Sequence, residues 1–474
     1  MGDPKGFIKF KRKEAGYRPI EERIQDYYEV EVLLSDDERK IQASRCMDCG
    51  VPFCHWSCPI GNIMPEWQDS IFHGNWEEAY AILNETNNFP EFTGRICPAL
   101  CEASCVLAKS DEAVTIRHNE WTVAEKAFEL GYVKPDTSIV KNGKTIAVIG
   151  GGPAGLACCD MLVKMGYTVT LFEAESKVGG FMRYGIPDFK LEKRIIDRRI
   201  DIMVQEGLII KTDTLAGRDI SVQELQSNFD AVCITIGARQ PRDLNIEGRE
   251  LKGIHFATEF LFQQNKACSG IPITDDELIR TLNRSVLVIG GGDTGADCVG
   301  TSIRQGARKV TQIEILPMPA DRRTEADPWP LWPRILRSSS SHKEGCERAW
   351  NIQTKKFIGE NGKLKKVIAS KVEWKKDDKG NFTPVEIPDS EFEIKCDVAL
   401  LAMGFVHPVH TGLVSDLGLE LDPRGNIKTN AKFQTSVEKI FAGGDSRRGA
   451  SLVVWAIKEG RDVAMNVDEF LRNK

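Results

Sequence analysis

The 474-residue sequence has no long hydrophobic run. No segment approaches the roughly 18 consecutive apolar residues of a membrane-spanning helix, and the first residues, MGDPKGFIKFKRKEAGY, contain charges but no apolar core of the kind that a secretion signal has. We therefore expect a cytoplasmic protein with no membrane partner. The length is enough for two or three domains, and a hydrophobic content of 41% is enough to build their cores.

The sequence also lacks an excess of positive charge. The net charge is −6, and by count residues 1–140 carry about −9 while the remainder carries about +3. A nucleic-acid partner is therefore not expected. A solvated acidic face is the simpler interpretation of the uneven distribution, and an acidic docking surface is the alternative.

Cysteine is sparse outside one region. Seven of the 14 cysteines fall between positions 46 and 105, and the others are scattered singly or as the Cys158-Cys159 pair. A secreted disulfide framework would need an oxidising compartment, and the absence of a secretion signal argues against one. No C-x-x-C motif of a dithiol relay occurs after residue 105. We expect Cys158 and Cys159 to pack in a core and the clustered cysteines to bind metal.

The clustered cysteines form two groups. The first reads C-x2-C-x4-C-x3-C-P over residues 46–59, and the second reads C-x3-C-x3-C over residues 97–105. Structural zinc sites usually take four ligands in two pairs, so seven thiols fit one zinc ion poorly. A run that closes on Cys-Pro is typical of bacterial ferredoxins, in which the fourth cysteine serves the other cluster. We expect two [4Fe-4S] clusters, with zinc and structural or redox thiols as the alternatives.

Two clusters need eight ligands, which leaves one position for a side chain other than cysteine. Glu120, in the segment TIRHNEW soon after Cys105, is the candidate, and His55 and His118 are its competitors. Taken singly, each of the three is more typical of a surface or packing residue than of a ligand.

Residues 145–157, TIAVIGGGPAGLA, read as a strand, a glycine-rich turn and the start of a helix. A second predicted strand, residues 168–172, is followed by an acid. In such a unit the glycines allow close approach to a pyrophosphate, the helix N-terminus faces that anion and the acid accepts a hydrogen bond from a ribose hydroxyl. The residues of this predicted dinucleotide site are Gly150, Gly152, Pro153, Ala154, Gly155 and Glu173.

The same unit recurs about 140 residues later, where residues 285–295 read SVLVIGGGDTG and a following strand ends in an acid. Its predicted site residues are Gly290, Gly292, Asp293, Thr294, Gly295 and Glu314. Two such units in one chain suggest that one nucleotide donates electrons to another.

Further glycine-rich segments favour the first unit as the flavin site. Gly180 and Arg183 follow it, and later apolar runs end in Gly237, in Gly404 and in Gly444-Asp445. A strand that ends in Gly-Gly-Asp can set an amide and a carboxylate against the ribityl chain and pyrophosphate of FAD. We expect an α/β protein with two Rossmann-like domains, one inserted in the other, after a mainly helical iron-sulfur domain. The expected boundaries are 1–140 for two clusters, 141–250 and 399–474 for FAD, and 251–398 for NAD(P)H.

Over essentially its whole length the chain resembles the small (beta) subunit of glutamate synthase, and its N-terminal half resembles the cluster and FAD portion of dihydropyrimidine dehydrogenase. The resemblance rests on the cysteine run, the segment NNFPEFTGRICP at 87–98, both glycine fingerprints and FAGGDS at 441–446. It implies FAD at the first fingerprint with Glu173 and Asp445, and the nicotinamide cofactor at the second. The cluster ligands it implies are Cys46, Cys49, Cys54 and Cys105 for one cluster and Cys58, Cys97, Cys101 and Glu120 for the other.

The role that the resemblance implies is electron input. Hydride would pass from NAD(P)H to FAD, and single electrons would leave through the clusters to a large (alpha) subunit that holds FMN and makes glutamate from glutamine and 2-oxoglutarate. No catalytic side chain is expected, because the cofactors carry the chemistry. The alternative is a separately acting or differently partnered NAD(P)H:acceptor oxidoreductase of the ferredoxin type. A non-catalytic binding module is the third hypothesis, and two intact fingerprints argue against it.

The choice between NADH and NADPH stays open. Glu314 favours the free 2′-hydroxyl of NADH, toward which we lean, whereas Arg322 and Arg323 would suit the 2′-phosphate of NADPH. The aromatic, proline-rich segment DPWPLWP at 327–333 is a loop that we hypothesise covers the nicotinamide site.

Overall fold

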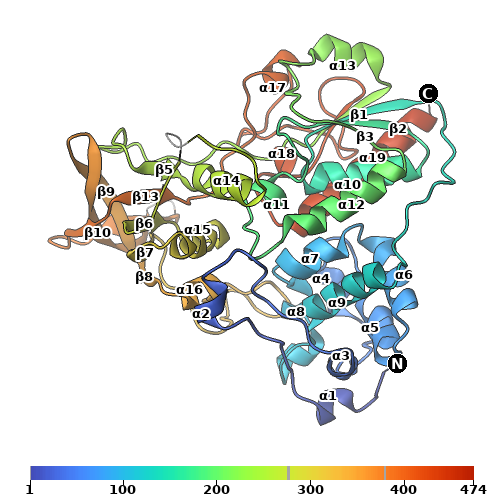
Figure 1. Cartoon of the computed structure of the whole chain (residues 1–474), viewed down its shortest axis with the longest axis horizontal. Coiled ribbons are helices and arrows are strands. Elements are labelled where there is room, and N and C mark those ends of the chain that lie inside the picture. The colour runs from blue at the N-terminus through green and yellow to red at the C-terminus, as the bar shows by residue number, and fades with distance from the viewer. Residues whose placement is uncertain (1, 275–277, 378–379, 474) are drawn as a thin grey trace.

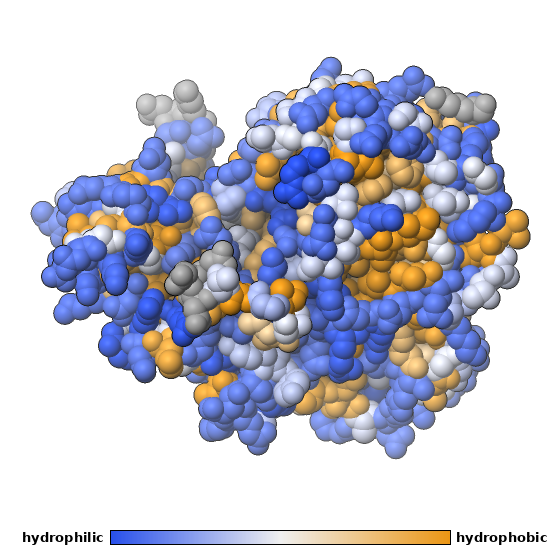
Figure 2. Space-filling view, turned by 45° about the horizontal axis from the view of Figure 1, so that its top comes forward, coloured by the Kyte–Doolittle hydropathy of each residue, from blue (hydrophilic) through white to orange (hydrophobic). Residues whose placement is uncertain are grey.

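The computed structural model describes residues 2–274, 278–377 and 380–473. It has an N-terminal helical part and two sheet-containing parts that lie above it and to one side (Figure 1). No helix in the described ranges is both long and apolar enough to cross a membrane. In the space-filling view, hydrophilic residues cover most of the visible face and a hollow separates the two sheet-containing lobes (Figure 2).

The N-terminal part is made of short helices packed around the cysteine segments. They are α1 (Gly6–Lys9), α2 (Ile20–Arg23), α3 (Asp36–Ala43), α4 (Phe53–Ser57), α5 (Met64–His73), α6 (Trp76–Thr86), α7 (Pro90–Ile96), α8 (Leu100–Ala103) and α9 (Ile116–Glu129), with a 3-10 turn at Val106–Lys109. Ser35 and Glu38 form a capping box that starts α3, and Gly74 ends α5 with a φ of 79°. The fully buried Trp67 and Ile71 place α5 in the core of this part.

The first sheet is parallel, with the order β14-β4-β1-β2-β3. Its strands are β1 (Thr145–Ile149), β2 (Thr168–Phe172), β3 (Ile209–Lys211), β4 (Ala231–Ile234) and β14 (Ile440–Ala442). Its helices are α10 (Pro153–Lys164), α11 (Phe181–Tyr184), α12 (Lys193–Gln205), α13 (Val222–Asn228), α17 (Leu413–Asp416), α18 (Asp445–Arg448) and α19 (Val453–Arg472). Alternate residues of β1 face opposite sides: Val148 packs with α10, α12 and α19, and Ile149 packs with α13 and α17.

The second sheet is also parallel, with the order β5-β13-β6-β7-β8. Its strands are β5 (Ile254–Phe256), β6 (Ser285–Ile289), β7 (Lys309–Glu314), β8 (Glu347–Trp350) and β13 (Val398–Leu401). Its helices are α14 (Ala257–Cys268), α15 (Asp293–Arg304) and α16 (Ser340–Lys343). An antiparallel sheet packs on the other face through β9 (Ile352–Glu360), β10 (Lys363–Lys376), β11 (Phe382–Glu386) and β12 (Phe392–Lys395).

The position of β13 corrects one expected boundary. Residues 399–474 were expected to return to the flavin domain, but β13 pairs with β5 and β6 in the second sheet. The chain crosses back only after Gly404, where residues 404–407 run antiparallel to residues 240–242. Arg242 N donates to Gly404 O at 3.0 Å and Val406 N donates to Gln240 O at 2.8 Å, so the two crossovers are tied together.

The N-terminal segment that precedes α3 reaches both sheet-containing parts. Val30 N donates to Phe189 O at 3.0 Å beside α12. Arg23 lies 2.7 Å from Glu344, which also pairs at 2.6 Å with Arg304 of α15. These three charged side chains are almost completely buried, so the segment links the helical part to the second sheet through a shielded charge cluster.

A second buried ion pair joins the helical part to the first sheet. Glu91 of α7 and Arg199 of α12 approach to 2.6 Å, and both are buried.

We expect Glu91→Gln to lower the free energy of unfolding by about 3–5 kcal/mol, because it leaves the buried guanidinium without its anion. Chemical denaturation followed by tryptophan fluorescence measures this change. The exposed pair of Lys432 and Glu469 is the matched control, and Lys432→Met should cost less than about 1 kcal/mol; equal effects of the two variants would contradict the role of the buried pair.

Candidate functional site

The first glycine-rich turn follows β1 and brings the backbone of strand and helix into close contact. Gly150 has a φ of 100°, and a Cβ on Gly155 would lie 1.9 Å from Gly150 O. Only glycine fits at both positions. The turn therefore places the N-terminus of α10, which begins at Pro153, at the carboxyl edge of the sheet, where an anion is favoured.

Glu173 follows β2 and is held by this turn. Its Oε2 accepts a hydrogen bond from Gly151 N at 2.8 Å and its Oε1 accepts one from Glu175 N at 2.9 Å. Burial raises the pKa of this carboxyl group. The structure thus brings Glu173 next to Gly150 and Gly152, as a dinucleotide site requires.

The other predicted flavin residues meet at the same edge. Gly237 follows β4 and Gly444 follows β14, with φ values of 72° and 67°. Asp445 accepts a hydrogen bond from Ser451 at 2.8 Å, and burial raises its pKa to about 6. Helix α19 then crosses α10 so closely that a Cβ on Gly460 would lie 2.1 Å from Ala154 O. This crossing brings the C-terminal piece to the first fingerprint.

Gly180 and Arg183 flank the turn differently. A Cβ on Gly180 would lie 2.8 Å from Gly152 Cα, so this loop rests directly on the turn. The buried Arg183 donates to Val178 O at 2.5 Å and pairs with Asp197, and its Nη1 has no hydrogen-bond partner within the described ranges. Two nitrogens of its guanidinium group therefore stabilise the loop, and Nη1 has an N–H donor that no described residue uses.

The second turn repeats the first in detail. Gly290 has a φ of 125°, and a Cβ on Gly295 would lie 2.4 Å from Gly290 O. Glu314 Oε2 accepts from Gly291 N at 2.6 Å and Oε1 accepts from Leu316 N at 3.0 Å. The same carboxylate-to-glycine hydrogen bond therefore closes both sites.

The open side of the second turn faces solvent. Gly292 and Asp293 are exposed at the N-terminus of α15, Thr294 is partly exposed, and no atom crowds a Cβ placed on Gly292. Gly404, which follows β13, has a φ of 78° and lies at the crossover between the two sheets, where the next residue, Phe405, packs on Phe181 beside Gly180.

Arg323 and the aromatic loop contact the helical part. Arg322 is exposed, whereas Arg323 donates to Asp327 O at 2.9 Å and to Ala103 O at 3.0 Å. The ring of Trp329 lies 4.5 Å from that of Phe53 in the cysteine region. The loop thus contacts the helical part through Trp329. Its Trp332 packs against Arg337, whose Cζ lies 4.2 Å from the ring centre, and Arg337 interacts electrostatically with Asp293 of the second turn, so the hypothesis that the loop covers the nicotinamide site stays a prediction.

The clustered cysteines line two pockets. Their volumes are about 390 and about 310 Å³, and each volume includes the part of the pocket that is open to solvent. The first pocket contains Cys46, Cys49, Cys54 and Cys105. The second contains Cys58, Cys97, Cys101 and Glu120. Each pocket therefore holds one of the two four-residue sets that the family resemblance implies.

Glu120 is the one candidate among three that reaches a pocket wall. Its Oε1 accepts hydrogen bonds from Asn87 at 2.7 Å and from Thr93 at 2.5 Å, and burial raises its pKa to about 7. His118 instead lies 3.4 Å from Glu31, and His55 lies 3.8 Å from Glu66. Neither histidine is among the residues that line the two pockets.

The thiols are poorly placed to ionise by themselves. Burial raises the pKa of Cys58 to about 11 and the pKa of Cys46 and Cys97 to about 12. Thiolates here need a bound cation or cationic group, which an iron-sulfur cluster supplies. No three His, Cys, Asp or Glu side chains in the described ranges are arranged to hold a single metal ion. The two sets are instead spread around their pockets, and their chemistry fits clusters.

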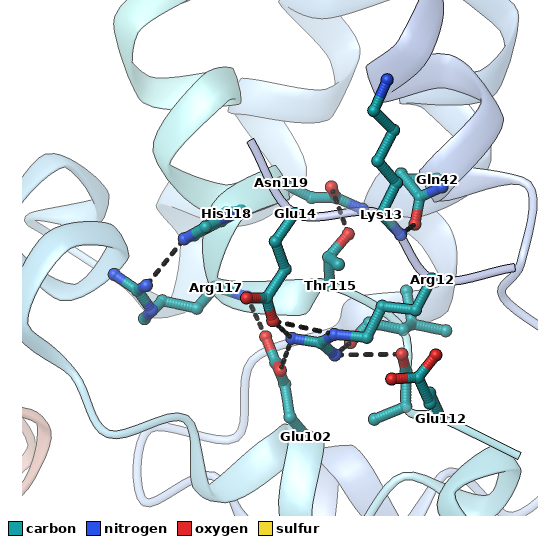
Figure 3. A network of polar contacts seen from close by, with 12 residues as sticks. Arg12, Lys13, Glu14, Gln42, Glu102, Glu112, Thr115, Arg117, His118 and Asn119 are labelled. Carbon is teal, nitrogen blue, oxygen red and sulfur yellow. Dashed lines mark hydrogen bonds and ion pairs between the residues drawn. The ribbon is translucent and has the colours of Figure 1, made fainter. Parts of the chain in front are cut away.

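A polar network holds these elements together (Figure 3). Glu102, next to Cys101 on α8, accepts from Arg12 at 2.8 Å and from the backbone N of Arg117 at 2.9 Å. Because Arg117 lies at the start of α9, this contact fixes α8 against the helix that carries Glu120.

Comparison with known proteins gives two family matches. Residues 144–460 match the pyridine nucleotide-disulphide oxidoreductase family, and residues 23–132 match domain II of dihydropyrimidine dehydrogenase, described as a 4Fe-4S cluster domain. The glutamate synthase [NADPH] small chain of Mycobacterium tuberculosis is 46% identical over 99% of this chain and 96% of that one. That of Bacillus subtilis is 41% identical over 99% of both. The chain belongs to the glutamate synthase small-chain family.

Membership confirms the expected family, the α/β class and the class of enzyme: the chain is an NAD(P)H-dependent flavoprotein oxidoreductase. Glutamate synthase [NADH] of Saccharomyces cerevisiae is 44% identical over 98% of this chain, which spans 22% of that protein. Among solved structures, FprA from Mycobacterium tuberculosis matches with a TM-score of 0.55 at 17% identity, over 70% of this chain and 85% of that one. This likeness supports the fold alone.

Sequence reasoning missed several residues of these sites. Asn87 and Thr93 orient Glu120, and the segment 87–98 was noticed only as a family signature. Val454 lines the second pocket although it lies far along the chain, at the start of α19. Gln68 lines the first pocket from α5, and nothing in its sequence context distinguishes it from other polar residues of an amphipathic helix.

The two glycine turns allow a matched test. We expect Gly155→Ala to lower bound FAD at least about tenfold, and Gly295→Ala to raise the KM for NAD(P)H at least about tenfold with FAD retained, because each Cβ pushes its helix away from the nucleotide. Flavin absorbance and steady-state kinetics with ferricyanide measure the two effects. Loss of FAD in Gly295→Ala, with FAD retained in Gly155→Ala, would reverse the assignment of the sites.

Proposed function

We propose that this chain is the electron-input subunit of glutamate synthase. It takes electrons from NAD(P)H at FAD and passes them through two [4Fe-4S] clusters to an FMN-containing large subunit, which makes glutamate from glutamine and 2-oxoglutarate. The bound groups supply the hydride and single-electron chemistry, and the chain positions them. The observation that carries the proposal is the pair of four-ligand pockets beside the flavin-type sheet.

The order of the pockets supports outward transfer. Val454, close after Asp445 in the chain, lines the second pocket, and Cys58 and Cys97 pack against the core of the first sheet. The first pocket is lined only by residues of the helical part. Trp56 of α4 lies in the chain between Cys54 of the first pocket and Cys58 of the second, and it is 66% exposed. We infer a route from the flavin site to the second pocket, then to the first pocket and then to the surface.

The site assignments are part of this proposal. FAD would bind at the first turn with Glu173, Gly180, Arg183, Gly237, Gly404 and Asp445, and NAD(P)H would bind at the second turn with Glu314. Each cluster would take the four residues that line its pocket. All 14 cysteines are free of disulfides, which fits the reducing cytoplasm where we place the protein.

Relatives in which the matching part belongs to one longer chain support a large subunit as the partner of this protein. This chain matches 22% of the glutamate synthases [NADH] of Saccharomyces cerevisiae and of Schizosaccharomyces pombe. In those proteins the matching part is covalently joined to a much longer remainder. A separate chain of this kind would assemble with a counterpart of that remainder, which we identify as the large subunit.

The identity of the donor is open to direct test. Bacterial small chains at 37% to 46% identity carry NADPH in their names, whereas Glu314 occupies the position that favours NADH. Of the arginine pair, Arg323 is held by hydrogen bonds to Asp327 O and Ala103 O, so the exposed Arg322 is the candidate partner for a 2′-phosphate.

The deciding experiment is an anaerobic purification with iron, sulfide and flavin analysis, followed by parallel titration with NADH and NADPH. We expect about eight irons and eight sulfides per FAD, and flavin bleaching by one nucleotide at low concentration. Glutamate should form only when the large subunit is added. Zinc in place of iron would overturn the proposal, and NAD(P)H:ferredoxin activity without complex formation would establish the separately acting enzyme instead.

A variant series tests the eighth ligand. Glu120→Ala should lower iron from about eight to about four per FAD, because the second pocket then offers only three ligands, while Glu120→Cys should retain iron by supplying a thiolate. Iron analysis and the electron paramagnetic resonance spectrum of the reduced protein measure this. His55→Ala and His118→Ala serve as controls with iron unchanged; loss of iron in either control alone would move the eighth ligand to that histidine.

A further inference from the structure

A buried arginine with no carboxylate of the described residues in ion-pair contact is connected by hydrogen bonds to the first pocket, and Glu38 and Glu102 act on it only at longer range. Arg39 of α3 is fully buried and donates from Nη1 to Asn119 Oδ1 at 2.8 Å. Its Nε and Nη2 have no hydrogen-bond partner within the described ranges. Burial lowers its pKa to about 10, which leaves it charged at neutral pH. An isolated buried charge is costly, so a compensating negative charge is expected nearby.

The hydrogen bonds that start at Arg39 have a defined direction. A guanidinium group can only donate, so Asn119 must present its oxygen, which also accepts from Thr115 at 3.1 Å (Figure 3). Asn119 then donates from Nδ2 to Gln68 Oε1 at 2.6 Å. Because its oxygen is used, Gln68 has only its N–H groups left to offer.

The end of this chain of hydrogen bonds is the first cysteine pocket. Gln68 is 1% exposed and lines the pocket together with Cys46, Cys54 and Cys105. Its Nε2 is buried and has no partner in the part of the chain that the structure describes. Gln68 Nε2 is therefore a buried N–H donor without a partner among the residues described, on the wall of the pocket that four thiolates would make strongly negative.

The second pocket carries an anionic side chain on its wall, and the cation that acts on it is Arg117 rather than Arg39. There the wall carries the carboxyl group of Glu120, and the nearby donors Asn87 and Thr93 are turned toward that carboxyl group. An anionic ligand disfavours a further negative charge, whereas a donor backed by a cation favours it.

We propose that Arg39, Asn119 and Gln68 form a polar relay that stabilises negative charge in the first pocket and raises the reduction potential of its cluster above that of the second. The proposal rests on the proposed function, since it needs both clusters. A one-electron reduction adds one negative charge to the group held by the four thiolates, and the relay stabilises that added charge. The resulting difference in potential directs electrons away from the flavin site toward the first pocket.

The test is a potentiometric titration with dithionite, monitored by electron paramagnetic resonance, on the whole chain with its full iron content. In Gln68→Met we expect the ratio of reduced to oxidised first cluster at a fixed potential to fall at least tenfold, which for one electron corresponds to about 59 mV. The second cluster should not shift. Glu120→Cys changes a ligand of the second cluster alone and so identifies its signal.

Variants of Arg39 provide an independent measurement. Arg39→Met should lower the reduction potential of the first cluster, as Gln68→Met does. Arg39→Lys should keep the potential close to that of the unchanged protein, because lysine retains the positive charge. The double variant Arg39→Met/Gln68→Met should shift the potential by less than the sum of the single changes, because the two residues act through one chain of hydrogen bonds.

Gln42 offers a matched control. It is a glutamine of the same helical part, 2% exposed and hydrogen-bonded through both ends of its amide, but it is not among the residues that line either pocket. Gln42→Met should leave both potentials unchanged. Unchanged potentials in a fully loaded Gln68→Met, or equal shifts of both clusters, would overturn the relay. If Gln68→Met incorporates iron incompletely, the comparison of Arg39→Met with Arg39→Lys tests the relay in its place. A chain without iron would instead refute the proposed function.

Discussion

The close crossing of α10 and α19 is the constraint on which the rest of the structure depends. With no side chain at Gly460, the backbone of the last helix can rest on Ala154 O at the start of the first dinucleotide helix. This contact joins two pieces of chain that are separated by the whole inserted domain. It sets Asp445 at the first glycine turn and carries Val454 to the wall of the second cysteine pocket. One backbone contact thus builds the flavin-type site and places it beside the cysteines.

Burial of charge organises the other interfaces. Arg199 and Glu91 join the helical part to the first sheet, and Glu344 joins it to the second sheet through two arginines. Such pairs are stable only when both partners stay together, because each charge has lost its water. They hold the three parts in a fixed arrangement, so the relative positions of the pockets and turns depend on them. Arg39 differs because its counter-charge would be supplied by a bound group.

Much of the site could be predicted because its signals are local. A strand, a glycine turn and an acid lie within one unit, and both units close through the same hydrogen bond from Gly151 or Gly291 to the acid. The division of the cysteines into two sets came from family resemblance, and spacing alone left it open. The start of the second flavin piece could not be placed, because β13 is an apolar strand that either sheet could accept.

The amino-acid sequence by itself determined the two dinucleotide units, the metal-binding character of the cysteine region and the membership of a family, since these depend on residue types at short spacing. Tertiary structure decided which side chains share a pocket. It turned Arg323 and Trp329 toward the helical part, and it placed Glu120, rather than a histidine, on the second pocket wall. It also connected Arg39 to the first pocket. Contacts between residues far apart in the chain follow from packing and burial, which no local pattern encodes.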